Sequence, residues 1–270
     1  MAEPVVSCEY SGRKAIITLS NQKKLNAMTQ PDYYNLARCL REIAQRDDIY
    51  ITIITGKGRF FSAGADVSVD RSRKPGTDAY RDLLRNFVAN NLNVTQAFYS
   101  HPKILVVALN GPAIGLSAAL TGFADFVYAA PHTFLLTPFS SLGLVAEGGS
   151  SIGFVQRMGL PKANEALIMS KRIKCDELVQ CGYVNKVFDT QPNESEKFLD
   201  LVVKEVDERL GAHLVPDSLV KIKALIRQPF RAQLDAQGVS EVYGGLNAFL
   251  KGVPQEEFRK IASGEKRHKL

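Results

Sequence analysis

Residues 104–124 read ILVVALNGPAIGLSAALTGFA and carry no charged side chain. An uncharged stretch of this length is long enough to cross a membrane. The turn signal Asn110-Gly111-Pro112 divides it, however, into a strand-like half, Ile104–Leu109, and a short helix, Gly115–Phe123. A strand followed at once by a helix is typical of a buried α/β core, so we expect no membrane span here.

The segments on either side repeat this alternation of strand and helix. After the Ser11-Gly12 turn the pattern predicts a hairpin, and the further strands expected are Ala15–Leu19, Ile49–Thr55, Phe126–Ala129 and Thr133–Leu136. Helices are expected over Pro31–Ala44, capped by Thr29, and over Asp78–Ser100. Asn91 is the polar exception on the apolar face of the second helix. The alternation predicts an α/β layered core.

The composition excludes several classes of protein. The chain has 270 residues, is 45% hydrophobic and carries a net charge of +6 that is scattered along it. Scattered basic charge does not indicate nucleic-acid binding, and it suits a polyanionic small ligand equally well. The cysteines Cys8, Cys39, Cys175 and Cys181 form no CxxC pair, so we expect neither disulfides nor a metal site.

A change of composition near residue 190 predicts the organisation of the chain. We expect a catalytic core over residues 1–190, an all-helical region over 191–262 and a basic tail over 263–270. The helical region is predicted to begin at a capping box formed by Asn193 and Glu196. Helices of this kind mediate oligomerisation or close a ligand site. The polar segment Val69–Thr77 is expected to be a loop, and no secretory signal is expected.

Three segments could carry chemistry. Small residues in Ala63-Gly64-Ala65-Asp66 allow backbone N–H groups to approach a ligand, and the junction before Gly115 presents the unpaired N–H groups of a new helix. Glu147 stands in an apolar, glycine-rich loop, and a carboxylate against apolar walls is a competent base near neutral pH. The structural alternatives are a tight turn, a packing junction and a glutamate in the first turn of a helix.

Together these segments resemble the crotonase (enoyl-CoA hydratase/isomerase) superfamily over roughly residues 10–190. The resemblance rests on Leu25-Asn26-Ala27, on 61–66 (FSAGAD) and on 110–115 (NGPAIG). It implies a spiral of ββα turns, helices that pack in trimers, and an acyl-CoA thioester as substrate. It also implies that the N–H groups of Ala65 and Leu116 bind the thioester oxygen.

Departures from the hydratase pattern narrow the expected activity. The two glutamates that activate water in hydratases fall here on Ala119 and Phe139, so hydration is disfavoured. Glu147 matches the base of the fungal peroxisomal Δ3,Δ2-enoyl-CoA isomerases. The resemblance therefore implies that one glutamate moves a 3-ene of an unsaturated fatty acyl-CoA to the trans-2 position. The alternatives are a dienoyl-CoA isomerase, which uses a second acidic residue, and a non-catalytic scaffold subunit.

The resemblance also assigns the remaining site residues. Asn91 either hydrogen-bonds Glu147 or is a satisfied core amide. The residues expected to contact substrate are Lys24, Leu25, Ala63, Gly64, Ala65, Asp66, Val67 and Leu116. Candidates for the CoA 3′-phosphate are Lys251, Arg259 and Lys260, and Phe87 and Phe98 are expected to border the acyl tunnel. No separate cofactor is expected, since CoA is part of the substrate.

Partners and location follow from the same resemblance. We expect a homotrimer or a hexamer built from two trimers, with no nucleic-acid partner and no membrane span. The tripeptide His268-Lys269-Leu270 resembles the Ser-Lys-Leu peroxisomal address. It predicts an import receptor as a partner and the peroxisomal matrix as the location.

Overall fold

A computed structural model describes residues 4–66, 76 and 78–266. The main sheet has six strands in the order β1-β2-β3-β4-β6-β9. Their bounds are β1 Val6–Ser11, β2 Lys14–Leu19, β3 Ile51–Gly56, β4 Ile104–Leu109, β6 Phe126–Ala129 and β9 Lys186–Val187. β1 and β2 form the predicted antiparallel hairpin, and every later neighbour in this sheet is parallel.

A second, smaller sheet explains the spiral course of the chain. It contains β5 Ala113–Ile114, β7 Phe134–Leu136 and β8 Ile173–Lys174, in that order. The chain leaves β4 for β5, returns to β6 and leaves again for β7, with a helix closing each turn. The predicted α/β fold built from ββα turns is thereby confirmed.

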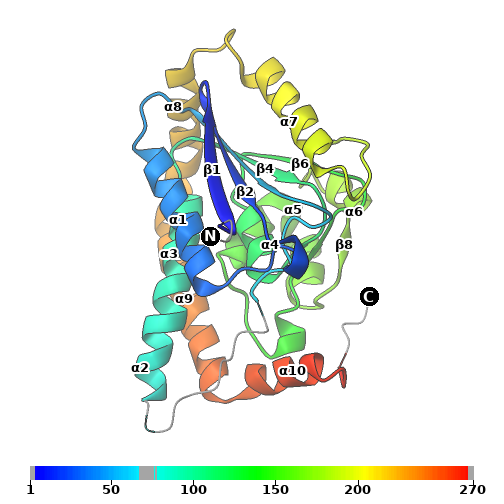
Figure 1. The fold of residues 1–270 in the computed structure, drawn as a ribbon. Coiled ribbons are helices and arrows are strands. Elements are labelled where there is room, and N and C mark those ends of the chain that lie inside the picture. Colours follow the sequence, from blue (N-terminus) through cyan, green and yellow to red (C-terminus); the bar gives the residue numbers. More distant parts are fainter. Residues whose placement is uncertain (1–3, 67–75, 77, 267–270) are drawn as a thin grey trace.

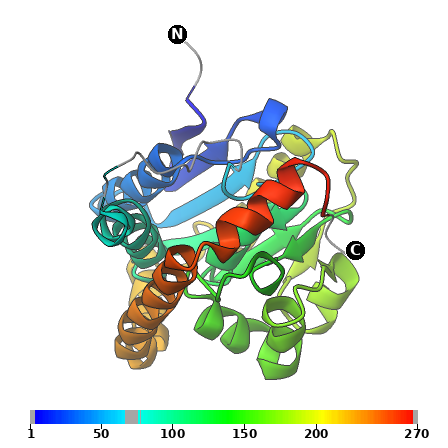
Figure 2. The same cartoon turned by 90° about the horizontal axis from the view of Figure 1, so that it is seen from below.

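The helices cover both faces of the main sheet. They are α1 Gln30–Ala44, α2 Ala79–Leu83, α3 Ala89–Tyr99, α4 Gly115–Thr121, α5 Ser150–Leu167, α6 Cys175–Gln180, α7 Ser195–Leu210, α8 Pro216–Arg227, α9 Arg231–Leu250 and α10 Val253–Ala262. In Figure 1, α1, α3 and α9 lie side by side, and Figure 2 shows α10 crossing the end of the molecule. The all-helical character of residues 191–262 is confirmed.

Alternation along β4 divides the core into two parts. Leu105, Val107 and Leu109 pack into the cluster beneath α1, α3, α4 and α5. Val106 and Ala108 point the other way and join Phe198, Val202 and Val206 of α7. Because successive side chains of a strand face opposite sides, a continuous apolar run is what a sheet covered on both faces requires.

Local signals predicted some helix starts and missed others. Thr29 caps α1 and forms a capping box with Asp32, as predicted for the start of this helix. The capping box predicted for Asn193 and Glu196 is wrong, because Glu194 is the N-cap residue of α7 and no side chain caps that helix. The Glu194 carboxylate instead accepts the N–H of Gln191 at 2.8 Å.

The helix predicted over Asp78–Ser100 is present but is not uniform. Asp78 caps it, and a π-helical turn over Leu84–Val88 separates α2 from α3. The predicted split of residues 104–124 into β4 and α4 is confirmed. Within the described residues, no helix is both long and apolar enough to cross a membrane. The predicted loop Val69–Thr77, apart from Gly76, and the tripeptide His268-Lys269-Leu270 lie outside the described residues.

Candidate active site

The first predicted backbone donor, the N–H of Ala65, lies on a segment that is hydrogen-bonded on both of its sides. Ala63 N–H donates to Leu25 O at 2.9 Å, and Ile114 N–H donates to Ser62 O at 2.9 Å. Next to Ala65, the Gly64 carbonyl accepts Met28 N–H and the Asp66 N–H donates to Met28 O, each at 2.8 Å. Both hydrogen bonds to Met28 are made by the neighbours of Ala65, and the N–H of Ala65 takes part in neither. No partner for it is recorded among the described residues.

The second donor lies next to the first. Leu116 is the second residue of α4, where an N–H group has no partner within the helix. Gly64 has φ +87°, and a Cβ atom there would lie only 2.7 Å from Ile114 O. This close approach of residues 64 and 114 brings the Ala65 and Leu116 segments together, and glycine is the residue that permits it.

Hydrogen-bonded hydroxyl groups connect α1, the segment at Ser62 and α4 at this junction. The hydroxyl of Ser117 lies 2.9 Å from the Tyr33 hydroxyl and 2.9 Å from the Ser62 hydroxyl. Ser62 Oγ also donates to Asn26 O at 2.8 Å and accepts Gly64 N–H at 3.1 Å. All of these side chains except Tyr33 are less than 2% exposed. The sequence gives no local signal for this network, because its members lie as many as 84 positions apart.

Glu147 lies in the loop between β7 and α5. It stands three residues before α5 begins at Ser150, so it is not in the first turn of that helix. Its carboxylate accepts the Asn91 Nδ2–H at 2.9 Å, and the Asn91 side chain also accepts Thr95 Oγ–H at 3.3 Å. The predicted contact between Asn91 and Glu147 is therefore present, and α3 is the element that supplies it.

The glutamate lies close to the second donor. A Cβ atom on Gly148 would lie 2.7 Å from Leu116 Cδ1 and 3.0 Å from Ala119 Cβ, so the chain passes α4 directly after Glu147. Ala119 and Phe139, where hydratases would hold carboxylates, are both buried. The Phe139 carbonyl accepts Leu144 N–H at 2.8 Å and so closes the loop on its apolar side. The loop that carries Glu147 thus passes beside the second predicted donor segment, next to apolar side chains of α4.

The residues expected to seat CoA lie beside the first donor. Lys24 Nζ forms an ion pair with Asp66 Oδ2 at 2.7 Å; the lysine side chain is 50% exposed and the aspartate side chain 7%. Leu25 adopts φ +54°, which turns the chain so that its carbonyl meets Ala63. Val67, the remaining predicted contact, lies outside the described residues. The structure places Lys24, Leu25 and residues 63–66 together.

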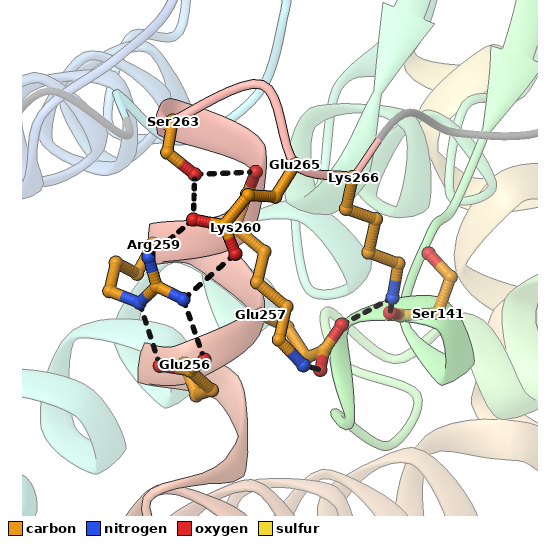
Figure 3. Close-up of polar contacts among 8 residues, drawn as sticks. All are labelled: Ser141, Glu256, Glu257, Arg259, Lys260, Ser263, Glu265 and Lys266. Atoms are coloured by element: carbon orange, nitrogen blue, oxygen red, sulfur yellow. Dashed lines mark hydrogen bonds and ion pairs between the residues drawn. The ribbon is translucent and has the colours of Figure 1, made fainter.

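Two of the three basic candidates for the CoA 3′-phosphate already have acidic partners. Arg259 forms ion pairs with Glu256 at 2.9 Å and Glu265 at 2.7 Å, and Lys260 pairs with Glu257 at 2.8 Å. Lys266 also meets Glu257 and donates to the Ser141 carbonyl (Figure 3). The hydrogen bond from Lys266 to Ser141 connects the segment after α10 to the loop that leads to Glu147. Among the described residues, no group of His, Cys, Asp or Glu side chains could hold a metal ion.

The predicted acyl-tunnel residues lie in different environments. Phe87, in the π-helical turn, stacks edge-on against Phe249 of α9 with ring centroids 5.0 Å apart. Phe98 is 4% exposed and belongs to the main core. Phe87 is therefore placed between α9 and the helix that carries Asn91, whereas Phe98 packs in the core.

Comparisons with known proteins identify the family of the chain. A family model described as enoyl-CoA hydratase/isomerase matches residues 11–261. A Delta(3,5)-Delta(2,4)-dienoyl-CoA isomerase of Pyricularia oryzae is 57% identical, covering 98% of this chain and 99% of its own. A 3,2-trans-enoyl-CoA isomerase of Saccharomyces cerevisiae is 36% identical, covering 98% and 96%.

The fold also has solved counterparts. The crystal structure of an enoyl-CoA hydratase/isomerase from Pseudoalteromonas atlantica superimposes with a TM-score of 0.83 at 23% identity, covering 98% of this chain and 100% of that one. At this identity the likeness concerns the fold alone. It confirms the crotonase-type spiral expected from the sequence.

Proposed function

The chain belongs to the enoyl-CoA hydratase/isomerase family, and on that basis we propose that it is a Δ3,Δ2-enoyl-CoA isomerase acting on unsaturated fatty acyl-CoA. The observation that carries the proposal is the position of Glu147, directly before the point where the chain passes Leu116 and Ala119 at Gly148, together with Ala119 and Phe139 where a hydratase would hold its two carboxylates. Similarity to proteins named as enoyl-CoA isomerases supports the same reaction class.

The mechanism needs one base and two donors. The N–H groups of Ala65 and Leu116 would hydrogen-bond the thioester oxygen and stabilise the negative charge that develops there. Glu147 would take a proton from C2, leaving a dienolate, and return that proton to C4. The double bond then moves from C3–C4 to C2–C3, and no atom is gained or lost. An apolar pocket favours this shuttle because it excludes competing water.

Asn91 would act on the base rather than on the substrate. Its amide donates to the Glu147 carboxylate at 2.9 Å and is itself fixed by Thr95. A carboxylate held by a buried amide keeps one orientation, which a proton transfer between two carbons requires. Lys24, Leu25 and residues 63–66 would seat the CoA moiety, and no separate cofactor is needed.

The test is a spectrophotometric assay with trans-3-hexenoyl-CoA, in which the conjugated product is followed. We expect the wild type to turn over and Glu147→Gln to lose about 10²- to 10⁴-fold in rate. Glu196→Gln, at an exposed side chain of α7, is the matched control and should be unaffected. Equal activity of the wild type and Glu147→Gln would contradict the mechanism. An inactive wild type that also fails to bind acyl-CoA would favour the scaffold alternative.

A dienoyl-CoA isomerase is the second candidate, and the relative of that name at 57% identity favours it. That reaction moves a proton from C2 to C6, two carbons beyond C4, and uses a second acidic residue. Ala119 and Phe139, which stand where hydratases hold glutamates, do not supply one. The two candidates separate in a competition between trans-3-hexenoyl-CoA and a 3,5-dienoyl-CoA. A higher kcat/KM for the dienoyl substrate would replace the first candidate with the second.

Assembly and location complete the proposal. One face of α8 exposes Ile222, Leu225 and Ile226, each more than half accessible, which supports contact with further copies of the chain. A homotrimer or hexamer stays a prediction that light scattering would check. The peroxisomal matrix is also still a prediction; a mouse relative, enoyl-CoA delta isomerase 3, peroxisomal, is 28% identical over 90% of this chain.

A further inference from the structure

A buried glutamate of α9 caps the helix that follows the base loop. Glu241 is 5% exposed, and its carboxylate accepts Gly149 N–H at 2.7 Å, Ser151 N–H at 3.0 Å and the Ser151 hydroxyl at 2.5 Å. These donors lie at the start of α5. The N-cap residue of this helix is Gly149, which has no side chain that could accept a hydrogen bond. A residue 92 positions away therefore supplies the missing cap.

This cap reaches Glu147 through a very short stretch of chain. The Glu147 carbonyl accepts the Ser150 hydroxyl at 2.8 Å and the Ser150 N–H at 3.3 Å. The linking residues Gly148 and Gly149 have φ +67° and +71°. Because glycines have wide conformational freedom, this linker holds one shape only if its ends are fixed from outside. The Glu241 carboxylate fixes one end.

The same helix also contacts the loop ahead of Glu147. A Cβ atom on Gly244 would lie 3.0 Å from Val145 Cγ2, so α9 packs closely against Val145. α9 therefore meets the loop at residue 145 and again at residues 149 and 151. Glu147 lies between the two contacts, and its position depends on both.

The energetics of Glu241 do not suit a purely stabilising residue. Burial raises the pKa of Glu241, and the hydrogen bonds from Ser151 and Gly149 only oppose this rise. Among the described residues, none of its recorded hydrogen-bond partners is charged. Burying a carboxylate without a cation costs free energy, so a role in function explains its presence better than stability does.

We propose that Glu241 is a positioning residue for Glu147: its carboxylate holds the start of α5 so that the base stays beside the donors at Ala65 and Leu116. The proposal rests on the proposed function of Glu147. Glu241 touches no reacting atom and acts only through the chain between residues 147 and 151.

The test compares Glu241→Gln with Glu205→Gln in the full-length protein. Glu205 is also a buried glutamate of the helical region. It lies on α7, where it pairs with Arg209 of the same helix and with Lys186 of β9, away from the base loop. Two readouts are taken: hydrogen exchange of the Gly149 and Ser151 amides, and kcat and KM with trans-3-hexenoyl-CoA. In Glu241→Gln we expect faster exchange at both amides and a fall in kcat of about 100-fold with KM unchanged. Glu205→Gln should leave all of these at wild-type values.

Other outcomes overturn the proposal in distinguishable ways. A folded Glu241→Gln with wild-type kcat, or with unchanged exchange at residues 149 and 151, removes the positioning role. Equal losses of kcat in both variants would indicate general destabilisation. If Glu241→Gln does not fold, Ser151→Ala removes one of the three donors and should give a smaller loss of kcat in the same direction. An inactive wild type overturns both the proposed function and the positioning role, whereas exchange still reports whether Glu241 anchors the loop.

Discussion

The donor side and the base side of the candidate site are built in different ways. The donor side, residues 62–66 and 112–117, is held by main-chain hydrogen bonds and buried serines of the α/β core. The base side, residues 139–151, is held by side chains that reach it from α3, α9 and Lys266, in the segment after α10. If the proposed roles hold, binding of the thioester oxygen and placement of the base should therefore be separable by substitution.

The largest effect is expected on the donor side, from Gly64→Ala. The new Cβ would lie 2.7 Å from Ile114 O at φ +87°, so the two donor segments must separate. Loss of one such donor typically costs about 10²- to 10³-fold in rate. We expect a loss of this size in kcat/KM together with weaker binding of trans-2-hexenoyl-CoA by calorimetry.

A control for this substitution is Gly182→Ala, which has φ +77° but open space around its Cβ. It tests backbone strain without the collision and should leave catalysis unchanged. If Gly64→Ala keeps wild-type kcat/KM, the close approach of residues 64 and 114 does not form the donor pair.

On the base side, Gly148→Ala is the counterpart of this change. Its Cβ would lie 2.7 Å from Leu116 Cδ1 and 3.0 Å from Ala119 Cβ, which pushes the loop with Glu147 away from α4. A misplacement of about 1 Å can cost about 100-fold in rate. We expect that loss in kcat while trans-2-hexenoyl-CoA still binds. Equal losses of binding in the Gly64 and Gly148 variants would show that the two sides are not separable.

Asn91→Ala should give a smaller loss. It removes one hydrogen bond to the Glu147 carboxylate and leaves the loop itself anchored. A hydrogen bond to a charged group contributes about 1.5 kcal/mol, equivalent to roughly tenfold in rate. Steady-state kinetics should show this change in kcat. A wild-type kcat would mean that Asn91 is a core amide whose contact with Glu147 has no catalytic consequence.

The smallest effect on catalysis is expected from His101, a buried residue that precedes β4 and hydrogen-bonds Thr52 at 2.8 Å. Burial, and then the positive charge of Lys223, lower the pKa of His101 to about 3. Between pH 6.5 and pH 3 the unfolded chain binds a proton that the folded chain does not. The free energy of unfolding therefore falls as the pH falls, by about 1.4 kcal/mol per pH unit. His101→Gln should reduce this slope in urea titrations without changing relative kcat values; an unchanged slope would refute it.

The sequence predicted what local patterns encode. Thr29, the Asn110-Gly111-Pro112 turn and the apolar run of β4 each contain their own signal, and the elements that they mark are present. The same patterns failed at Asn193, because α7 begins one residue later than predicted, with Glu194 as its N-cap and no side chain capping it. The two-residue strands β5 and β8 are too short to show a period.

The candidate site divides in the same way. Ala65, Leu116 and Glu147 stand in recognisable motifs, so the resemblance to a family could point to them. Glu241 stands in none: it lies on a helix whose sequence neighbours are ordinary, and its partners are about 90 positions away. Only the folded chain shows that its carboxylate meets Gly149 and Ser151.

The reach of α9 to the base loop sets an order of events during protein synthesis. Most partners of the segments that carry the predicted donors precede them in the chain, but β5 pairs with β7, so these segments have all their partners only once Leu136 has been translated. The loop with Glu147 acquires Glu241 only after a further stretch of more than one hundred residues has been translated. A chain that ends ahead of α9 would therefore contain the partners of both predicted donor segments but lack the carboxylate that caps α5 beside Glu147.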